Sequence, residues 1–293
     1  MVPHHHQAAA LADFPAVRRV LEQSSVVVAG LQLDVRAPSQ RLSVAAGIGA
    51  GGSAMEATTS LPVGCVGKPL LAASFLRRLF AAGLSVDAPL SAVIPQCNSS
   101  LLARVQLRRL LHHDAGLDNY FAPYIFVHPR ERWDELALGY DWSHVASEFR
   151  LSAAYSEFVA FHLLALAAER TFAEPLLSKG TIAWLRSRGC AADVGRPAEG
   201  SGDDHIWLAG RWRATKRPDV VSGHVVYDFW TSARSMCRFY SVLLNALRDS
   251  GSELHEVARS MTSDRRGPKA DRGLGRECDF GLGVMVDLAH HLV

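Results

Sequence analysis

Lysine is scarce in this chain, although lysine and arginine together number 31 of the 293 residues. The four lysines are Lys68, Lys179, Lys216 and Lys269. Arginine keeps its proton in proteins, whereas burial can turn a lysine into a base, so each lysine is a candidate for chemistry. The alternative is that a given lysine only solvates a surface, which is the usual case.

Long runs of one charge sign are absent, and the net charge is only +2. We therefore expect neither a nucleic acid nor a membrane surface as a partner. The five cysteines lack the paired C-x-x-C spacing that a zinc site requires, which favours neither a metal centre nor a disulfide framework. The glycines of residues 49–53 lack the spacing of a phosphate-binding loop. The sequence thus predicts no metal and no cofactor.

The amino terminus has no basic start followed by a long apolar run, so no signal peptide is predicted and a cytoplasmic location is expected. Residues 1–11 contain three consecutive histidines and are expected to be disordered.

The remaining composition, 48% apolar and 20% charged, is that of a globular protein. Apolar periodicity predicts an early helix over residues 12–23 and then a hairpin of two strands, 26–35 and 41–47. A strongly apolar helix over residues 68–82 is ended by Gly83. Further helices are predicted over residues 105–113, 156–170 and 232–247, whereas residues 197–202 and 211–218 are polar and predicted to be irregular.

One pair of reactive side chains stands directly at the start of the helix over residues 68–82. Cys65 and Lys68 are three positions apart, which in a helix places both side chains on one face. The amine could take the proton of the thiol or stabilise the thiolate, which the positive amino terminus of a helix also favours. Alone, the pattern is weak, because a cysteine is most often a small buried apolar residue.

The segments around Cys65 and Lys68 support a catalytic role for this pair. Residues 61–79 and the following residues 82–90, which contain Gly83-Leu84-Ser85-Val86-Asp87, resemble the Ser-x-x-Lys helix and following turn of class C β-lactamases and related esterases. Residues 105–117 are similar to that family's segment Ile-Thr-Ile-Arg-His-Leu-Leu-Thr-His-Thr-Ser-Gly-Leu. His112 and His113, within this segment, are interpreted as structural residues at a helix end rather than as bases.

Three further matches follow in the same order as in the family. Tyr155-Ser156-Glu157 resembles the Tyr-x-Asn element, residues 231–239 resemble a Ser-Thr-Ala-x-Asp-Met-Ala-Arg-Phe helix, and Phe280-Gly281-Leu282-Gly283 follows near the end. The resemblance implies acyl transfer through a covalent intermediate, with Cys65 as nucleophile and Lys68 and Tyr155 moving protons. It implies a substrate-binding role for Glu157 and a small-molecule acyl substrate. Tyr155 as an ordinary packed aromatic is the alternative.

The sequence departs from the family at three points. Cys65 replaces the nucleophilic serine, and sulfur is a stronger nucleophile but larger than oxygen. Glu157 replaces the asparagine and would favour a protonated Lys68. No Lys/His-Thr/Ser-Gly motif is found, so we expect a carboxyl-terminal truncation that leaves a sheet edge exposed, which a partner chain would cover.

The sequence thus predicts an α/β fold of the β-lactamase/transpeptidase type, with an antiparallel sheet flanked by helices. The domain is predicted to span residues 12–293, with a mostly helical insertion at about 91–217. The predicted function is that of a hydrolase or acyltransferase acting on an ester, amide or lactam through Cys65. The alternatives are an inactive binding module of the same fold and an incomplete member of the family.

Overall fold

The computed structural model describes residues 15, 19, 30–36, 41–49, 53–97, 101–117, 128–139, 155–156, 158–194, 204–208, 211–215, 224–226, 228–271 and 276–286. Residues 1–11, predicted to be disordered, lie outside the described residues, as do most of the predicted helix over residues 12–23 and Glu157. The chain forms two compact units. The first comprises Met1–Val63, Ile182–Asp219 and Asp228–Val242, and the second comprises Gly64–Thr181, Val220–Tyr227 and Leu243–Val293.

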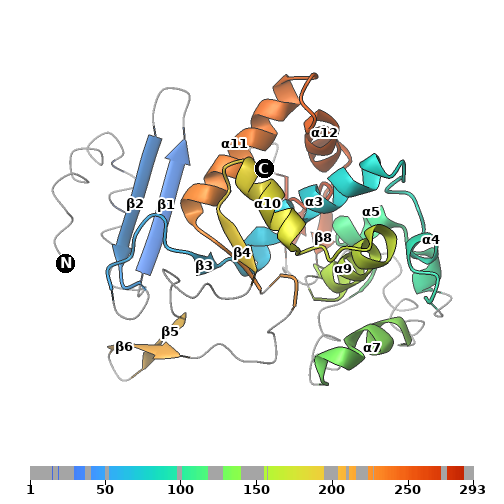
Figure 1. The fold of residues 1–293 in the computed structure, drawn as a ribbon, viewed down its shortest axis with the longest axis horizontal. Helices are drawn as coiled ribbons and strands as arrows, with labels where there is room; N and C mark the ends of the chain where they lie inside the picture. The colour runs from blue at the N-terminus through green and yellow to red at the C-terminus, as the bar shows by residue number, and fades with distance from the viewer. Residues whose placement is uncertain are drawn as a thin grey trace. The chain divides into compact units, whose positions relative to one another are not determined.

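The first unit contains the predicted amino-terminal hairpin (Figure 1). Strands β1 (Gly30–Arg36) and β2 (Arg41–Gly47) pair antiparallel, with Leu33 opposite Val44. Because side chains alternate between the two faces of a strand, Leu42 and Val44 of β2 share one face and are both buried. The hairpin predicted over residues 26–35 and 41–47 is therefore confirmed for its described residues, whereas residues 26–29 lie outside them.

A three-stranded sheet also belongs to the first unit. Strand β7 (Phe229–Thr231) lies in its centre and pairs antiparallel with β3 (Leu61–Pro62) and β4 (Ala192–Val194). All three residues of β7 are buried, as expected for a central strand. In the described part of the chain, the hairpin and this sheet form separate sets of strand pairs.

One strand of the first unit corrects the prediction that residues 211–218 are irregular. Residues Arg211–Thr215 form β6, which pairs antiparallel with β5 (Asp204–Leu208), with Trp207 opposite Trp212. The arginines on both sides of Trp212 hid the strand, although tryptophan and threonine favour extended backbone. Among the described residues of the predicted insertion, the regular elements are therefore helices except for β4, β5 and β6.

The second unit is built around helix α3 (Lys68–Ala81), which packs against α9 (Phe158–Phe172) and α12 (His255–Ser263). Ten of the fourteen α3 residues are buried, among them Leu70, Leu71, Phe75, Leu76 and Leu79. Gly83 follows α3 with a φ of 68°, the left-handed conformation that commonly ends a helix. The predicted helix and its end are confirmed.

The other elements of the second unit are short. They are α4 (Leu90–Val93), η3 (Leu102–Arg104), α5 (Leu107–Leu111), η5 (Arg130–Arg132), α7 (Trp133–Gly139) and the hairpin of β8 (Lys269–Asp271) and β9 (Arg276–Cys278). The two remaining helices are α10 (Lys179–Ser187) and α11 (Ala233–Arg248). Helix α11 confirms the helix predicted over residues 232–247. Among the described residues, no helix combines the length and apolarity needed to cross a membrane.

Candidate active site

Cys65 lies in a short 3-10 turn, η2 (Gly64–Gly67), which continues directly into α3. Gly64 begins the turn with a φ of 51°, a left-handed conformation that glycine adopts without a steric cost. The Cys65 side chain is exposed, and its neighbour Val66 is 62% exposed. Because η2 continues directly into α3, Cys65 and Lys68, three positions apart, are expected on the same side of the chain.

Lys68, the first residue of α3, is only 4% exposed. A buried ammonium group is costly unless polar or aromatic partners compensate for its lost hydration. Lys68 Nζ donates a hydrogen bond to Tyr155 Oη and lies 3.9 Å from the centroid of the Tyr155 ring. The centroid of the Phe161 ring is 5.9 Å from the same nitrogen. The faces of both aromatic rings attract a cation. Two predicted site residues, 87 positions apart, are thus in direct contact.

The other lysines differ from Lys68 in their surroundings. Lys179 and Lys269 are exposed, and Lys216 lies outside the described residues. Lys269 Nζ is 3.2 Å from Asp114 Oδ2, a surface ion pair of the kind that contributes little to stability. Within the described part of the chain, Lys68 is therefore the lysine whose environment suits proton transfer.

The backbone of Tyr155 is held by a buried ion pair that no motif in the sequence indicated. Tyr155 N–H donates to Asp271 Oδ1 at 3.0 Å, and Arg266 Nη2 donates to Asp271 Oδ2 at 3.1 Å. The side chains of Arg266 and Asp271 are both 0% exposed. Arg266 Nη1 also donates to the carbonyl oxygens of His112 and His113, at 3.1 and 3.0 Å. Asp271 is 116 positions from Tyr155, so no local pattern could have revealed the contact.

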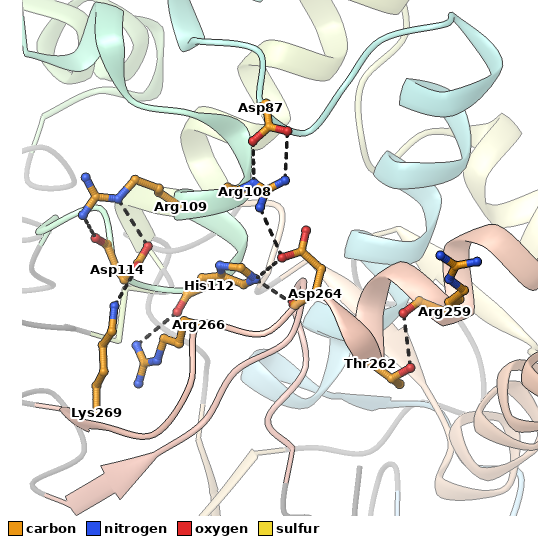
Figure 2. Close-up of polar contacts among 10 residues, drawn as sticks. All are labelled: Asp87, Arg108, Arg109, His112, Asp114, Arg259, Thr262, Asp264, Arg266 and Lys269. Atoms are coloured by element: carbon orange, nitrogen blue, oxygen red, sulfur yellow. Dashed lines mark hydrogen bonds and ion pairs between the residues drawn. The ribbon is translucent and has the colours of Figure 1, made fainter.

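A second polar network connects α5 to the residues that follow α12 (Figure 2). Arg108 Nε is 2.7 Å from Asp87 Oδ1, and Arg108 Nη1 is 3.4 Å from Asp264 Oδ1. His112 Nε2 donates to the Asp264 carbonyl oxygen at 2.8 Å. Burial lowers the pKa of His112, and the bond to Asp264 partly opposes this. The interpretation of His112 as a structural residue at the end of α5 agrees with these contacts.

The Phe280–Gly283 segment packs against both α3 and α5. Gly283 N–H donates to the Leu111 carbonyl oxygen at 3.1 Å, and its φ is 80°. A Cβ atom at this position would collide with the side chain of Ala72 in α3. The close approach explains why glycine stands at position 283.

Three predictions stay open at this site. Glu157 lies outside the described residues, so its predicted contact with substrate stays a prediction. The same holds for the absent third motif and for a partner chain at the sheet edge. Among the residues described, no group of three histidine, cysteine, aspartate or glutamate side chains could hold a metal ion.

Three solved structures of similar fold carry the names of hydrolases. EstCE1, "a hydrolase with promiscuous acyltransferase activity", aligns with a TM-score of 0.72 and 17% identity over 95% of this chain and 83% of its own. A D-stereospecific amidohydrolase from Streptomyces aligns with a TM-score of 0.65 and 18% identity, over 95% and 84% of the two chains. A class C β-lactamase from Rhodobacter sphaeroides gives 0.59 and 15%, over 88% and 70%.

Comparison of the sequence with curated proteins found no match. The sequence profile described as "Beta-lactamase", however, matches residues 21–292, nearly the whole chain. The resemblance inferred from the order of the short motifs is therefore confirmed at the level of the family. The chain belongs to the Beta-lactamase family, a family of hydrolases.

Proposed function

We propose that this protein is a β-lactamase-related hydrolase or acyltransferase that acts on an ester, amide or lactam through a covalent acyl-enzyme at Cys65. The observation that carries the proposal is the hydrogen bond between Lys68 Nζ and Tyr155 Oη, one turn from the exposed Cys65. An exposed nucleophile next to a pair of groups that can exchange a proton is the arrangement that covalent catalysis requires.

The first half of the proposed reaction forms a thioester. Cys65 Sγ attacks the carbonyl carbon of the substrate, and the thiol proton passes to the Lys68–Tyr155 pair. The tetrahedral intermediate then collapses as the bond to the leaving group breaks. The pair returns the proton to the departing alcohol or amine, which leaves Lys68 and Tyr155 as they began.

The second half consumes the thioester. Water attacks the acyl carbon in hydrolysis, whereas an alcohol or amine attacks it in acyl transfer. In either case the Lys68–Tyr155 pair takes a proton from the attacking group and returns it to the departing sulfur of Cys65. The description of EstCE1 names both kinds of activity, so both products belong in the test.

The test measures the intact mass of the protein after incubation with a p-nitrophenyl ester and, separately, with a penicillin. We expect a mass increase equal to the acyl group, located on Cys65 by peptide mapping and decaying with time. Cys65→Ala should form no adduct, whereas Cys65→Ser should form an oxygen ester at the same position. Adding a primary alcohol as acceptor distinguishes acyl transfer from hydrolysis through the products released.

A variant of the proton-transfer pair sharpens the test. Tyr155→Phe retains the ring beside Lys68 but lacks the hydroxyl group, so acylation should slow by about 100-fold to 10,000-fold. Binding of the ester should change little, because the substitution removes a single oxygen. A folded wild-type protein that binds these compounds without an adduct would instead support an inactive binding module.

A further inference from the structure

The backbone N–H groups of Tyr155 and Ser156 are both bound by side chains. Tyr155 and Ser156 precede α9, and their backbone N–H groups donate to side chains 116 and 43 positions away, Asp271 and His113. Most backbone amides in proteins pair with other backbone groups. Because two successive amides are bound by buried side chains, the position of this segment depends on residues distant in the sequence, Asp271 and His113.

His113 makes two different contacts with this segment. Its Nδ1 accepts the Ser156 N–H at 3.1 Å. Its ring centroid lies 4.6 Å from that of Tyr155, with 39° between the planes. The His113 ring is itself held in place by the rings of Phe280 and Phe161, whose centroids lie 5.0 and 6.1 Å from its own.

The chemistry of His113 suits an acceptor. The residue is 2% exposed, and burial, followed by the charges of Lys68 and Arg266, holds its pKa well below the usual value. A neutral imidazole has a lone pair on one nitrogen, and acceptance at Nδ1 leaves the proton on Nε2. His113 also has a φ of 54°, an uncommon conformation for a residue with a side chain, which turns the chain sharply after α5.

We propose that His113 is a positioning residue for Tyr155, holding its ring by direct contact and its backbone through the amide of Ser156. Together with Asp271, it fixes the hydroxyl group of Tyr155 against Lys68. The inference rests on the proposed function of Lys68 and Tyr155 as the proton-transfer pair, but the placement of the Tyr155 ring is measurable without any turnover.

The test uses His113→Asn in the full chain, because asparagine tolerates a positive φ and its side-chain oxygen can still accept the Ser156 N–H. The variant therefore removes mainly the ring. The matched control is His224→Asn. His224 is 1% exposed and its Nδ1 accepts the Val226 N–H at 3.3 Å, but its ring lies beside Trp133 and His162.

Two readouts are compared. The first is the fluorine NMR spectrum of protein labelled with 3-fluorotyrosine at its six tyrosines, in which Tyr155→Phe identifies the Tyr155 resonance. The second is the rate of Cys65 acylation by a p-nitrophenyl ester. In His113→Asn we expect the Tyr155 resonance to move toward its unfolded position and acylation at saturating ester to slow about 10-fold to 100-fold, with KM nearly unchanged. His224→Asn should alter only the melting temperature.

An unchanged resonance and acylation rate in a folded His113→Asn variant would overturn the inference. If the wild type forms no adduct, the proposed function fails, and the Tyr155 resonance alone decides the role of His113. If His113→Asn does not fold, nitrogen NMR of the wild-type imidazoles decides. A proton on Nδ1 of His113 would rule out the bond from Ser156, whereas a proton on Nε2 would support it.

Discussion

Replacing Asp271 with alanine should lower the free energy of unfolding far more than the removal of a small side chain suggests. The Asp271 carboxylate and the Arg266 guanidinium are both 0% exposed and 3.1 Å apart. Asp271→Ala leaves the Arg266 charge buried without its counterion, which costs about 3–5 kcal/mol. It also removes the acceptor of the Tyr155 N–H, which costs about 1–3 kcal/mol more.

The matched control is Asp264→Ala. Asp264 also contacts an arginine, Arg108, but the two side chains are 24% and 31% exposed, and Arg108 retains Asp87 as a partner. The bond from His112 goes to the Asp264 backbone carbonyl and survives the substitution. A partly exposed pair of this kind, open to solvent, contributes about 0.2–1 kcal/mol. We therefore expect Asp271→Ala to destabilise the protein by about 3 kcal/mol or more beyond Asp264→Ala.

Urea unfolding followed by circular dichroism at 222 nm gives the free energy of unfolding from the midpoint and slope. A loss of this size is a large part of the about 5–15 kcal/mol that a typical domain has. If the two variants unfold within about 1 kcal/mol of each other, the argument that the buried Arg266–Asp271 pair holds this region is wrong.

Three further outcomes are expected. Gly283→Ala should lower the free energy of unfolding by about 2–5 kcal/mol, because a Cβ there meets Ala72. Gly83 also has a positive φ, but a Cβ there meets open space, so Gly83→Ala should lower it by only about 1–2 kcal/mol, as measured by thermal unfolding. Equal losses would contradict the packing described for the 280–283 segment. Because the folded His113 has a lowered pKa, the unfolded chain binds the extra proton, so stability should fall as the pH drops below about 6.5, by up to about 1.4 kcal/mol per pH unit. Urea midpoints from pH 7.5 to 5.5 measure this slope, which should be shallower in His113→Asn. Burial raises the pKa of Cys190 to about 11, so only about 0.1% is thiolate at pH 8, and iodoacetamide should label the exposed Cys65 first. Mass spectra that show Cys190 labelled as fast as Cys65 would refute this order.

Local features were predictable where one face of an element meets the core. Helix α3 followed from its nearly unbroken run of apolar residues and the glycine after it, and the β1–β2 hairpin followed from apolar alternation. Strand β6 was not predicted, because arginines flank Trp212 and interrupt the apolar pattern. Its extended backbone is stabilised by pairing with β5, which the local sequence does not reveal.

Candidate site residues were predictable where a motif contains them. Cys65 and Lys68 stand three positions apart in the chain, and Tyr155 was identified from a resemblance that the family profile now supports. The contact between Lys68 and Tyr155 was implied by that resemblance, but its geometry was not. The burial of Lys68 was likewise not readable, since a lysine at the start of a helix is usually solvated.

The sequence by itself therefore determined the family, the main helices and the three residues of the proposed reaction. Only the tertiary structure decided what holds Tyr155 in place. Asp271 and His113 contact Tyr155 and Ser156 across 116 and 43 positions, and Arg266 contacts His113 across 153 positions. These are buried polar groups that must find partners once water is removed. Such contacts leave no periodic trace in the sequence, because pairing between distant positions depends on how the helices pack and not on the neighbours of each residue.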